Sequence, residues 1–468
     1  MSRFEAALRR ILPYVCGAWV IVIFASLKWR FLDPFLATTW HGRIGFDFFS
    51  IPRAFINLVH GQSIYATRAC SYGPYATWFP YHPAAAVYAG SWLSVFPPWA
   101  AFYVFAVFSV LVLLFCARLL GRLSGNALNR SFICFLLIFP LPVYLMIWNG
   151  QLHVLLLAAF CLVFYDLLSP EDGAALRPAL MAGILLSLFS KPLVLLALPA
   201  LLAVPSRRKT VLWSAAAYAA VSLAFILIPA LNPRAAGFAR IWDVLAHPAH
   251  MFRREIYRGV QIVSYRPEML ADNAIHWLNM RFRDGIGQPG HFELMSLSSF
   301  CGDIAGRRLP GWILKIPAAA ALAVSLKLFF APQSRRAGAA VFAVMAAALS
   351  FFLSYDGVYE YHYAVALVPL AVMLILHEKE TDAVSARLMR WFCGCGALLL
   401  VPTSYFWLRN PAFGFHRPAL AGLNDIYISV FTSSHIYDWA LVMIRWSRVL
   451  PALVMFSLAV ALAWRHSR

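Results

Sequence analysis

The sequence predicts an all-α, polytopic membrane protein. Of its 468 residues, 62% are hydrophobic and 13% are charged, which excludes an ordinary soluble domain, and the mean hydropathy is +0.71. Apolar runs recur at lengths near the roughly 20 residues that cross a bilayer core of about 30 Å. A helix satisfies its own backbone hydrogen bonds in lipid, so each run predicts a helix. The six clearest runs are 15–27, 100–116, 131–148, 211–228, 313–330 and 449–464.

The run 15–27 is expected to be a retained membrane anchor. Arg3, Arg9 and Arg10 precede it, as in a signal peptide, but no small-residue cleavage site follows. Most other basic residues fall in short loops between runs, where the positive-inside rule places them, so the formal charge of +19 does not indicate a nucleic-acid partner. We therefore expect a single membrane domain over residues 1–468, with about twelve crossings of the plasma (inner) membrane and both termini in the cytoplasm.

Two long loops are expected outside the membrane, at residues 30–83 and 230–310. The first follows the anchor directly and combines acidic and basic residues with many aromatic ones. A carboxylate at the edge of a bilayer is costly to maintain, so Asp47 in this loop is a candidate functional residue, whereas Asp33 before a proline resembles a cap at the end of the first span.

The first half of the chain admits two topologies, which differ in whether residues 83–96 cross the membrane. This run of about 14 residues is short enough for a re-entrant or surface helix. If it does not cross, the arginines within 118–130 lie in the cytoplasm, and residues 179–204 form two short helices broken at Lys191 and Pro192, near the outer surface. If it crosses, those arginines lie outside and 179–204 is one kinked helix. The charge rule and the proline favour the first version.

The cysteine and histidine patterns predict neither a metal site nor a cofactor. Four of the eight cysteines, Cys16, Cys116, Cys134 and Cys161, lie in apolar runs and are expected to fill the core, and Cys393 and Cys395 are too close in sequence for a usual zinc pair. Cys70 and Cys301 both fall in the expected outer loops, which leaves a disulfide open. His247 and His250 have no nearby carboxylate or cysteine to complete a ligand set.

An ordered series of segments resembles a known family. The segments DFFSIPRAFINLVHGQSIY from residue 47, FPYHPAAAVYAGSWLSVFP from 79, WNGQLHVLLLAAF from 148, MAGILLSLFSKPLVLLALPALL from 181 and LSFFLSYDGVYEYHYAVALVPL from 349 are similar to the polyprenol-phosphate-dependent glycosyltransferases of family 87, in the GT-C superfamily. The chain departs from the family pattern at residues 49–51 and at His82, which leaves the sugar and the acceptor open.

The resemblance implies a GT-C-like bundle and a membrane enzyme. Its donor would be a polyprenyl-phosphate-linked hexose, most often mannose, and its acceptor an envelope glycan or glycolipid at the outer face of the lipid bilayer. The leaving group is a phosphate and the acceptor hydroxyl must lose a proton, so the site needs cations and a base.

Asp47 is the candidate base of a single, inverting displacement, with a helix-capping or ion-paired aspartate as the alternative. Arg53 lies six residues further and is expected to orient this carboxylate, to hold phosphate or to remain a solvated surface charge. Lys191 is the candidate ligand of the donor phosphate, because a lysine within an apolar run is costly unless it is paired or reaches water by snorkelling.

Four further residues complete the expected donor site. Glu360 and His362 are alternate residues at the start of a span near Asp356 and do not share a face, so we expect one of them, His362, to face the cavity. Asn149 and Gln151 offer amides for sugar hydroxyls, or are simply polar residues of a turn. His82 is expected to have a surface role rather than to line the cavity.

Two other functions compete with the enzyme. A transporter or flippase of a lipid-linked sugar would share a basic and aromatic cavity but would need no base at Asp47. No internal repeat is visible in the sequence, which weakens that alternative because many transporters are built from related halves. A structural membrane subunit would not account for the ordered series of segments.

Overall fold

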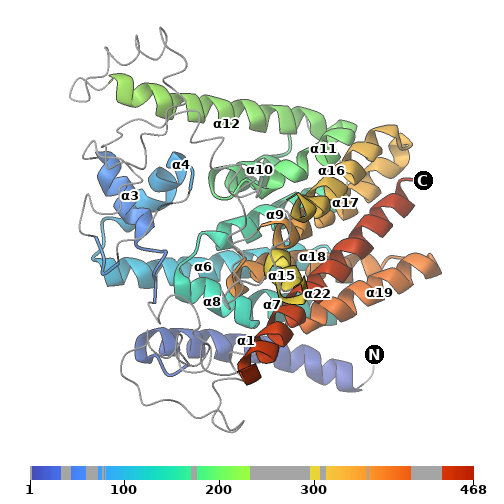
Figure 1. The fold of residues 1–468 in the computed structure, drawn as a ribbon, viewed down its shortest axis with the longest axis horizontal. Coiled ribbons are helices and arrows are strands. Elements are labelled where there is room, and N and C mark those ends of the chain that lie inside the picture. Colours follow the sequence, from blue (N-terminus) through green and yellow to red (C-terminus); the bar gives the residue numbers. More distant parts are fainter. Residues whose placement is uncertain are drawn as a thin grey trace.

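The computed structural model is a bundle of helices (Figure 1). It describes residues 3–32, 44–59, 72–75, 79, 81–169, 176–231, 296–305, 312–355, 358–401 and 435–468, and no β-strand occurs among them. The α-helices are α1 (Arg3–Trp29), α3 (Ser50–Val59), α4 (Pro83–Ala85), α5 (Ser91–Leu93), α6 (Pro98–Gly121), α7 (Ala127–Ile138), α8 (Leu141–Asn149), α9 (His153–Leu168), α10 (Pro178–Phe189), α11 (Leu198–Ala203), α12 (Pro205–Leu231), α15 (Leu297–Ala305), α16 (Ile316–Lys327), α17 (Gln333–Ser354), α18 (Leu367–His377), α19 (Ala383–Leu398) and α22 (His435–His466). Shorter 3-10 or π segments are η2 (Ala86–Gly90), η3 (Leu193–Leu196), η7 (Ile313–Lys315), η8 (Leu328–Phe330) and η9 (Glu360–Ala366).

Several helices are suited to a membrane. Within the described ranges, six are long and apolar enough to cross a bilayer, or seven if α7 and α8 form one bent span. The all-helical class is therefore confirmed, whereas the expected number of about twelve crossings stays a prediction. Peripheral helices expose large apolar side chains, including Ile21 (71% exposed) on α1 and Leu111 (59%) on α6, as lipid contact requires.

The centre of the bundle consists of residues 339–354 of α17 and 360–373 of the η9–α18 segment, which are buried. Helix α17 packs along α22 and α16, while α9 packs against α10. The close α9–α10 contact depends on Gly183, because a Cβ there would lie 2.7 Å from the carbonyl oxygen of Ala159. The core therefore combines consecutive helices, α9 with α10 and α16 with α17, with the distant pair α17 and α22.

Two of the expected spans are interrupted at prolines. The run 131–148 is not one straight helix, because α7 and α8 meet at an angle of 43° at Pro140. The run 179–204 is broken at Lys191 and Pro192, between α10 and η3, as the version with two short helices predicts. Proline has no amide hydrogen and cannot continue the preceding helix.

Residues 83–96 do not form a membrane-spanning helix. The segment is helical only from α4 to α5, that is over 83–93, which at 1.5 Å per residue is roughly half of the 30 Å bilayer core. It packs against α3, where a Cβ at Gly90 would lie 2.7 Å from the carbonyl oxygen of Ile51. The version of the topology without a crossing here is the one that the structure supports.

Contacts between loops support the same topology, in which residues 83–96 do not cross the membrane. Glu378, just after α18, accepts hydrogen bonds from the backbone of Gly125 and the side chain of Asn129, in the turn between α6 and α7 and in α7. The arginines within 118–130 therefore lie at the same end of the bundle as residues 377–390, which the crossing version would place on opposite sides. Both chain termini also lie toward this end, away from α3 and α4 (Figure 1).

Some expectations fall outside the described residues. These are the roles of Asp33, Asp356, His247 and His250, the Cys70 half of the disulfide, and most of the loop 230–310. Among the described cysteines, Cys16, Cys116 and Cys161 are buried, as core filling predicts.

Candidate active site

Asp47 lies in a tight turn over residues 44–49 that is anchored on both sides. Gly45 adopts a positive φ of 68°, and its amide donates to the carbonyl of Trp148 at 2.8 Å. Phe48 and Phe49 are fully buried and pack on Phe102. The half-buried carboxylate of Asp47 is thus held between an anchored glycine and two buried rings.

The end of α8 is shaped to receive this turn. Gly150 has a φ of 67°, and the amides of Gly150 and Gln151 donate to the carbonyls of Ile147 and Met146, which is a Schellman motif. A Cβ at Gly150 would lie 2.4 Å from the Cβ of Phe48. Only glycine allows this approach, which places Gln151 beside Asp47.

Lys191 reaches the same place from the break between α10 and η3. The hydroxyl of Ser187 donates to the carbonyl of Lys191 at 2.8 Å and accepts from the amide of Val194 at 3.2 Å, so one side chain bridges the break. Lys191 is 1% exposed, and a buried ammonium requires polar partners. The structure supplies them.

A chain of hydrogen bonds connects Lys191 to Asp47. The Lys191 Nζ lies 2.6 Å from Nε2 and 3.1 Å from Nδ1 of His153, and the same Nδ1 lies 3.1 Å from Oε1 of Gln151. The Nε2 of Gln151 donates to Oδ2 of Asp47. These bonds are consistent when His153 accepts from Lys191 and donates to Gln151, a tautomer that also orients the amide. We name these four side chains the Lys191–Asp47 chain.

Two tyrosines fix the amide of Gln151 from the sides. The Tyr81 hydroxyl donates to Oε1 of Gln151 at 3.0 Å, and Nε2 of Gln151 donates to the Tyr361 hydroxyl at 3.3 Å. Both rings are buried, so the amide has little rotational freedom.

His362 lies beside the chain. Its ring is 4.3 Å from that of His153, measured between centroids, and nearly perpendicular to it. Its Nδ1 accepts from the amide of Tyr359 at 2.9 Å, so in the neutral ring Nε2 carries the proton. This Nε2 is buried and has no hydrogen-bond partner among the described residues. It is therefore a donor available to a ligand oxygen.

The side-chain amide of Asn149 is also buried without a hydrogen-bond partner among the described residues. The side chain is fully buried at the end of α8, and neither of its polar atoms has a hydrogen-bond partner within the described ranges. Buried polar groups are rarely left unsatisfied. Asn149 and His362 thus both suit a polar ligand.

Burial dominates the electrostatics of Asp47. Loss of solvent raises the pKa of its carboxyl group to about 6, although the charge of Lys191 and the hydrogen bond from Gln151 act in the opposite direction. At neutral pH the group is ionised, yet it is far more basic than a surface aspartate. This is the range in which a carboxylate serves as a general base.

Arg53 and Glu360 have other partners. Arg53 is 3% exposed, not a solvated surface charge, and its Nη2 donates to the carbonyls of Tyr72 and Tyr75 at 2.6 and 2.5 Å. Glu360 forms a buried ion pair with Arg448 at 2.7 Å. These contacts hold segments of the fold together, and a role of either residue in donor binding stays a prediction.

Two expectations about individual residues need correction. His82 does not have a surface role, because it is fully buried, accepts from the amide of Ala84 and lies 3.1 Å from the hydroxyl of Ser222. Asp47 does not cap α3 with its side chain, because its carboxylate bonds to Gln151 and only its backbone carbonyl contacts Ser50. The carboxylate of Asp47 is therefore directed toward the other members of the Lys191–Asp47 chain.

His153 is the member of the Lys191–Asp47 chain that the sequence did not predict. A single histidine at the start of an apolar run is ordinarily a core residue. The available signal was its spacing, since it follows Asn149 and Gln151 in the same turn and opens α9.

No group of three His, Cys, Asp or Glu side chains within the described ranges is arranged to hold a metal ion. No protein-family model matches the chain, and neither a curated protein nor a solved structure is significantly similar to it.

Proposed function

We propose that this protein is a membrane glycosyltransferase of the GT-C type. It would transfer a hexose, with mannose as the first candidate, from a polyprenyl phosphate to an envelope glycan or glycolipid at the outer face. The observation that carries the proposal is the Lys191–Asp47 chain, which has a basic carboxylate at one end and a buried cation at the other.

The reaction is a single displacement. The acceptor hydroxyl oxygen attacks the anomeric carbon while the bond from that carbon to the phosphate oxygen breaks, and the hydroxyl proton passes to the carboxylate of Asp47. Attack opposite to the leaving group inverts the anomeric carbon. The polyprenyl phosphate departs with an additional negative charge.

Lys191 and His362 suit that departing charge. A buried ammonium strongly favours a phosphate oxygen, because little water competes for it. The unpartnered Nε2 of His362 offers a second donor beside it. The amide of Asn149 suits a sugar hydroxyl.

His153 and Gln151 are positioning residues. They link the cation to the base, so that movement of one end is transmitted to the other. A well-oriented base and leaving group lower a reaction barrier substantially, because correct placement replaces a chance encounter.

The test is a pair of substitutions in the purified protein in nanodiscs, supplied with a polyprenyl phosphate mannose carrying a radiolabelled sugar and with envelope glycan acceptors. Asp47→Asn should reduce transfer roughly 10²- to 10⁴-fold while donor binding survives. Lys191→Met should mainly weaken donor binding. Glu378→Gln makes the same change from carboxylate to amide at the opposite end of the bundle and should leave transfer unchanged.

Three outcomes would contradict this assignment. Near-normal transfer by Asp47→Asn would move the base elsewhere, and unchanged donor affinity in Lys191→Met would make that residue a structural cation. A wild-type protein that moves the labelled lipid between leaflets without forming a glycosidic bond would be a flippase, the competing function.

A further inference from the structure

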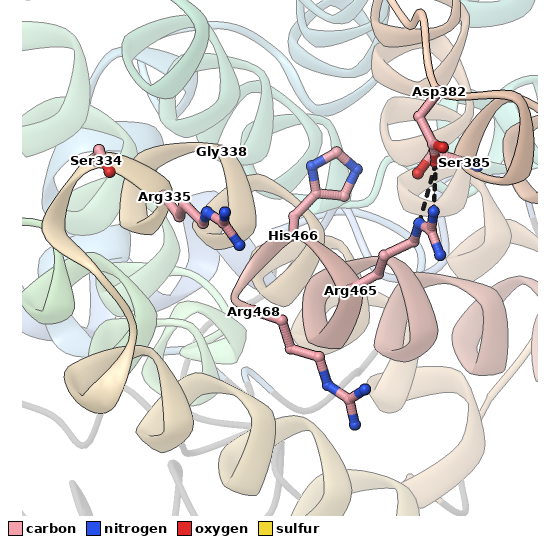
Figure 2. Close-up of a pocket in the computed structure, with 8 residues that line it drawn as sticks. All are labelled: Ser334, Arg335, Gly338, Asp382, Ser385, Arg465, His466 and Arg468. Atoms are coloured by element: carbon pink, nitrogen blue, oxygen red, sulfur yellow. Dashed lines mark hydrogen bonds and ion pairs between the residues drawn. The ribbon is translucent and has the colours of Figure 1, made fainter.

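A second polar site lies at the opposite end of α17. It is a cavity of about 670 Å³ where α17 and α19 begin and α22 ends (Figure 2). The residues that line it are Ser334, Arg335, Gly338, Asp382, Ser385, Arg465, His466 and Arg468. None of them belongs to the proposed active site.

The cavity carries an excess of positive charge. Three arginines line it against one aspartate, and that aspartate is already engaged, because Asp382 pairs with Arg465 at 2.9 Å and caps α19 through the amide of Ser385. The side chain of Arg335 has no hydrogen bond or ion pair among the described residues. Arg468 lies 5.5 Å from the ring of Trp464 without a carboxylate partner in that part of the chain. Two guanidinium groups thus remain available to an anion.

The cavity also has room for a ligand. A Cβ at Gly338 would have no atom within 4 Å, so the space extends to the backbone of α17. His466 packs against Phe342 at 4.8 Å, and its Nε2 is buried without a hydrogen bond within the described ranges. Glu380 approaches this nitrogen only to 3.6 Å. An anion in the cavity would meet donors on two sides.

The surroundings indicate the surface of a bilayer. Trp464 is 45% exposed, and the Nζ of Lys327 lies 2.9 Å above its ring. Phe330, in the adjoining turn, is 89% exposed. Exposed aromatic residues beside lysine are typical of the level of lipid headgroups.

We propose that this cavity binds a phosphate-bearing anion, from a phospholipid headgroup of the adjacent leaflet or from a soluble phosphate compound. Guanidinium groups match phosphate oxygens in geometry as well as charge. The negative surface potential of a cytoplasmic leaflet would concentrate headgroups at the mouth of the cavity. The inference stands apart from the proposed transfer reaction.

The test uses the full-length protein in nanodiscs of phosphatidylglycerol and phosphatidylcholine, with native mass spectrometry of the lipids that remain bound and titration with inorganic phosphate as a second arm. The double variant Arg335→Gln with Arg468→Gln should reduce retention of phosphatidylglycerol roughly tenfold, because it removes two charge-assisted contacts. Gly338→Leu should do the same by placing an apolar side chain in the cavity, and its Cβ would meet no atom within 4 Å. Arg122→Gln, an exposed arginine at the end of α6, is the matched control and should change nothing.

The arms distinguish the two sources. Selective retention of phosphatidylglycerol that resists phosphate supports a lipid headgroup, and saturable binding of phosphate without selective lipid retention supports a soluble anion. Equal retention of both lipids with no phosphate binding would overturn the proposal. Binding that survives in Gly338→Leu would do so too, even if the double variant failed to fold.

Discussion

Gly150→Ala tests whether the geometry of the Lys191–Asp47 chain controls activity. The φ of 67° at this position costs a residue with a side chain about 1–2 kcal/mol. The new Cβ would also lie 2.4 Å from the Cβ of Phe48 and 3.3 Å from its Cα. Ordinary carbon contacts begin near 3.5 Å, so Phe48 must retreat by about 1 Å.

The retreat of Phe48 carries Asp47 with it, because the two are consecutive in the turn. The hydrogen bond from Gln151 to the carboxylate should be lost or lengthened. A displacement of about 1 Å in a catalytic group can lower the rate 10²-fold. We expect transfer to fall by roughly that factor while the free energy of unfolding drops by only about 2–3 kcal/mol, within the range of ordinary point mutations.

The assay compares transfer of labelled sugar and the thermal midpoint of Gly150→Ala with those of Gly394→Ala. A Cβ at Gly394, within α19, meets no atom within 4 Å, so that variant should keep its activity and should not be destabilised. If Gly150→Ala retained full activity while remaining folded, the argument that this close contact positions the base would be refuted.

Two further predictions concern the Lys191–Asp47 chain, and a third concerns a separate buried ion-pair cluster of Asp166 on α9, Arg177 before α10 and Arg207 on α12. The kcat/KM for transfer should be independent of pH well above 6 and should fall tenfold per pH unit below it, because protonated Asp47 cannot accept a proton. This fall at acid pH, the acid limb of the profile, should be absent in Asp47→Asn. His153→Phe keeps a flat ring but removes the hydrogen bond that holds Gln151 in place. Because the hydrogen bond from Gln151 lowers the pKa of Asp47, the loss of activity at acid pH should begin at a higher pH in this variant. An unchanged pH profile would show that the role of His153 is only structural. Asp166→Asn breaks buried ion pairs with Arg177 and Arg207, at 3.1 and 3.2 Å. The free energy of unfolding should fall by about 3–5 kcal/mol, which differential scanning fluorimetry would detect as a lower Tm. A loss under about 1 kcal/mol would show that this triad contributes little to stability.

The sequence predicts the class of fold well, because hydropathy is a direct physical signal. The apolar runs 100–116, 313–330 and 449–464 predict α6, α16 and the end of α22 close to their observed positions, and Pro192 predicts the break beside Lys191. Bends are harder to predict. Pro140 interrupts a run that reads as one span, because the composition on its two sides is the same.

A candidate site residue can be predicted from the sequence where burying its charged side chain costs free energy. Lys191 stands out because an unpaired ammonium in an apolar run is expensive, and its observed partner His153 accounts for that cost. The partner itself gives no such signal, since a neutral imidazole is tolerated in a core. The charges of Arg53 and Glu360 also draw attention in the sequence, but they do not reveal the observed partners: Arg53 donates to two backbone carbonyls and Glu360 pairs with Arg448.

The charged groups of the Lys191–Asp47 chain have hydrogen-bond partners, whereas two guanidinium groups in the cavity beside Arg335 have none among the described residues. This difference indicates what each site can bind. In the Lys191–Asp47 chain the two charged groups are linked through His153 and Gln151, so a ligand must exchange one set of hydrogen bonds for another, which favours a defined substrate. In the cavity beside Arg335 the guanidinium groups face open space and outnumber the carboxylates, so a ligand adds contacts without breaking any. Such a site selects for negative charge rather than for shape, as expected of an anion that is abundant at a membrane surface.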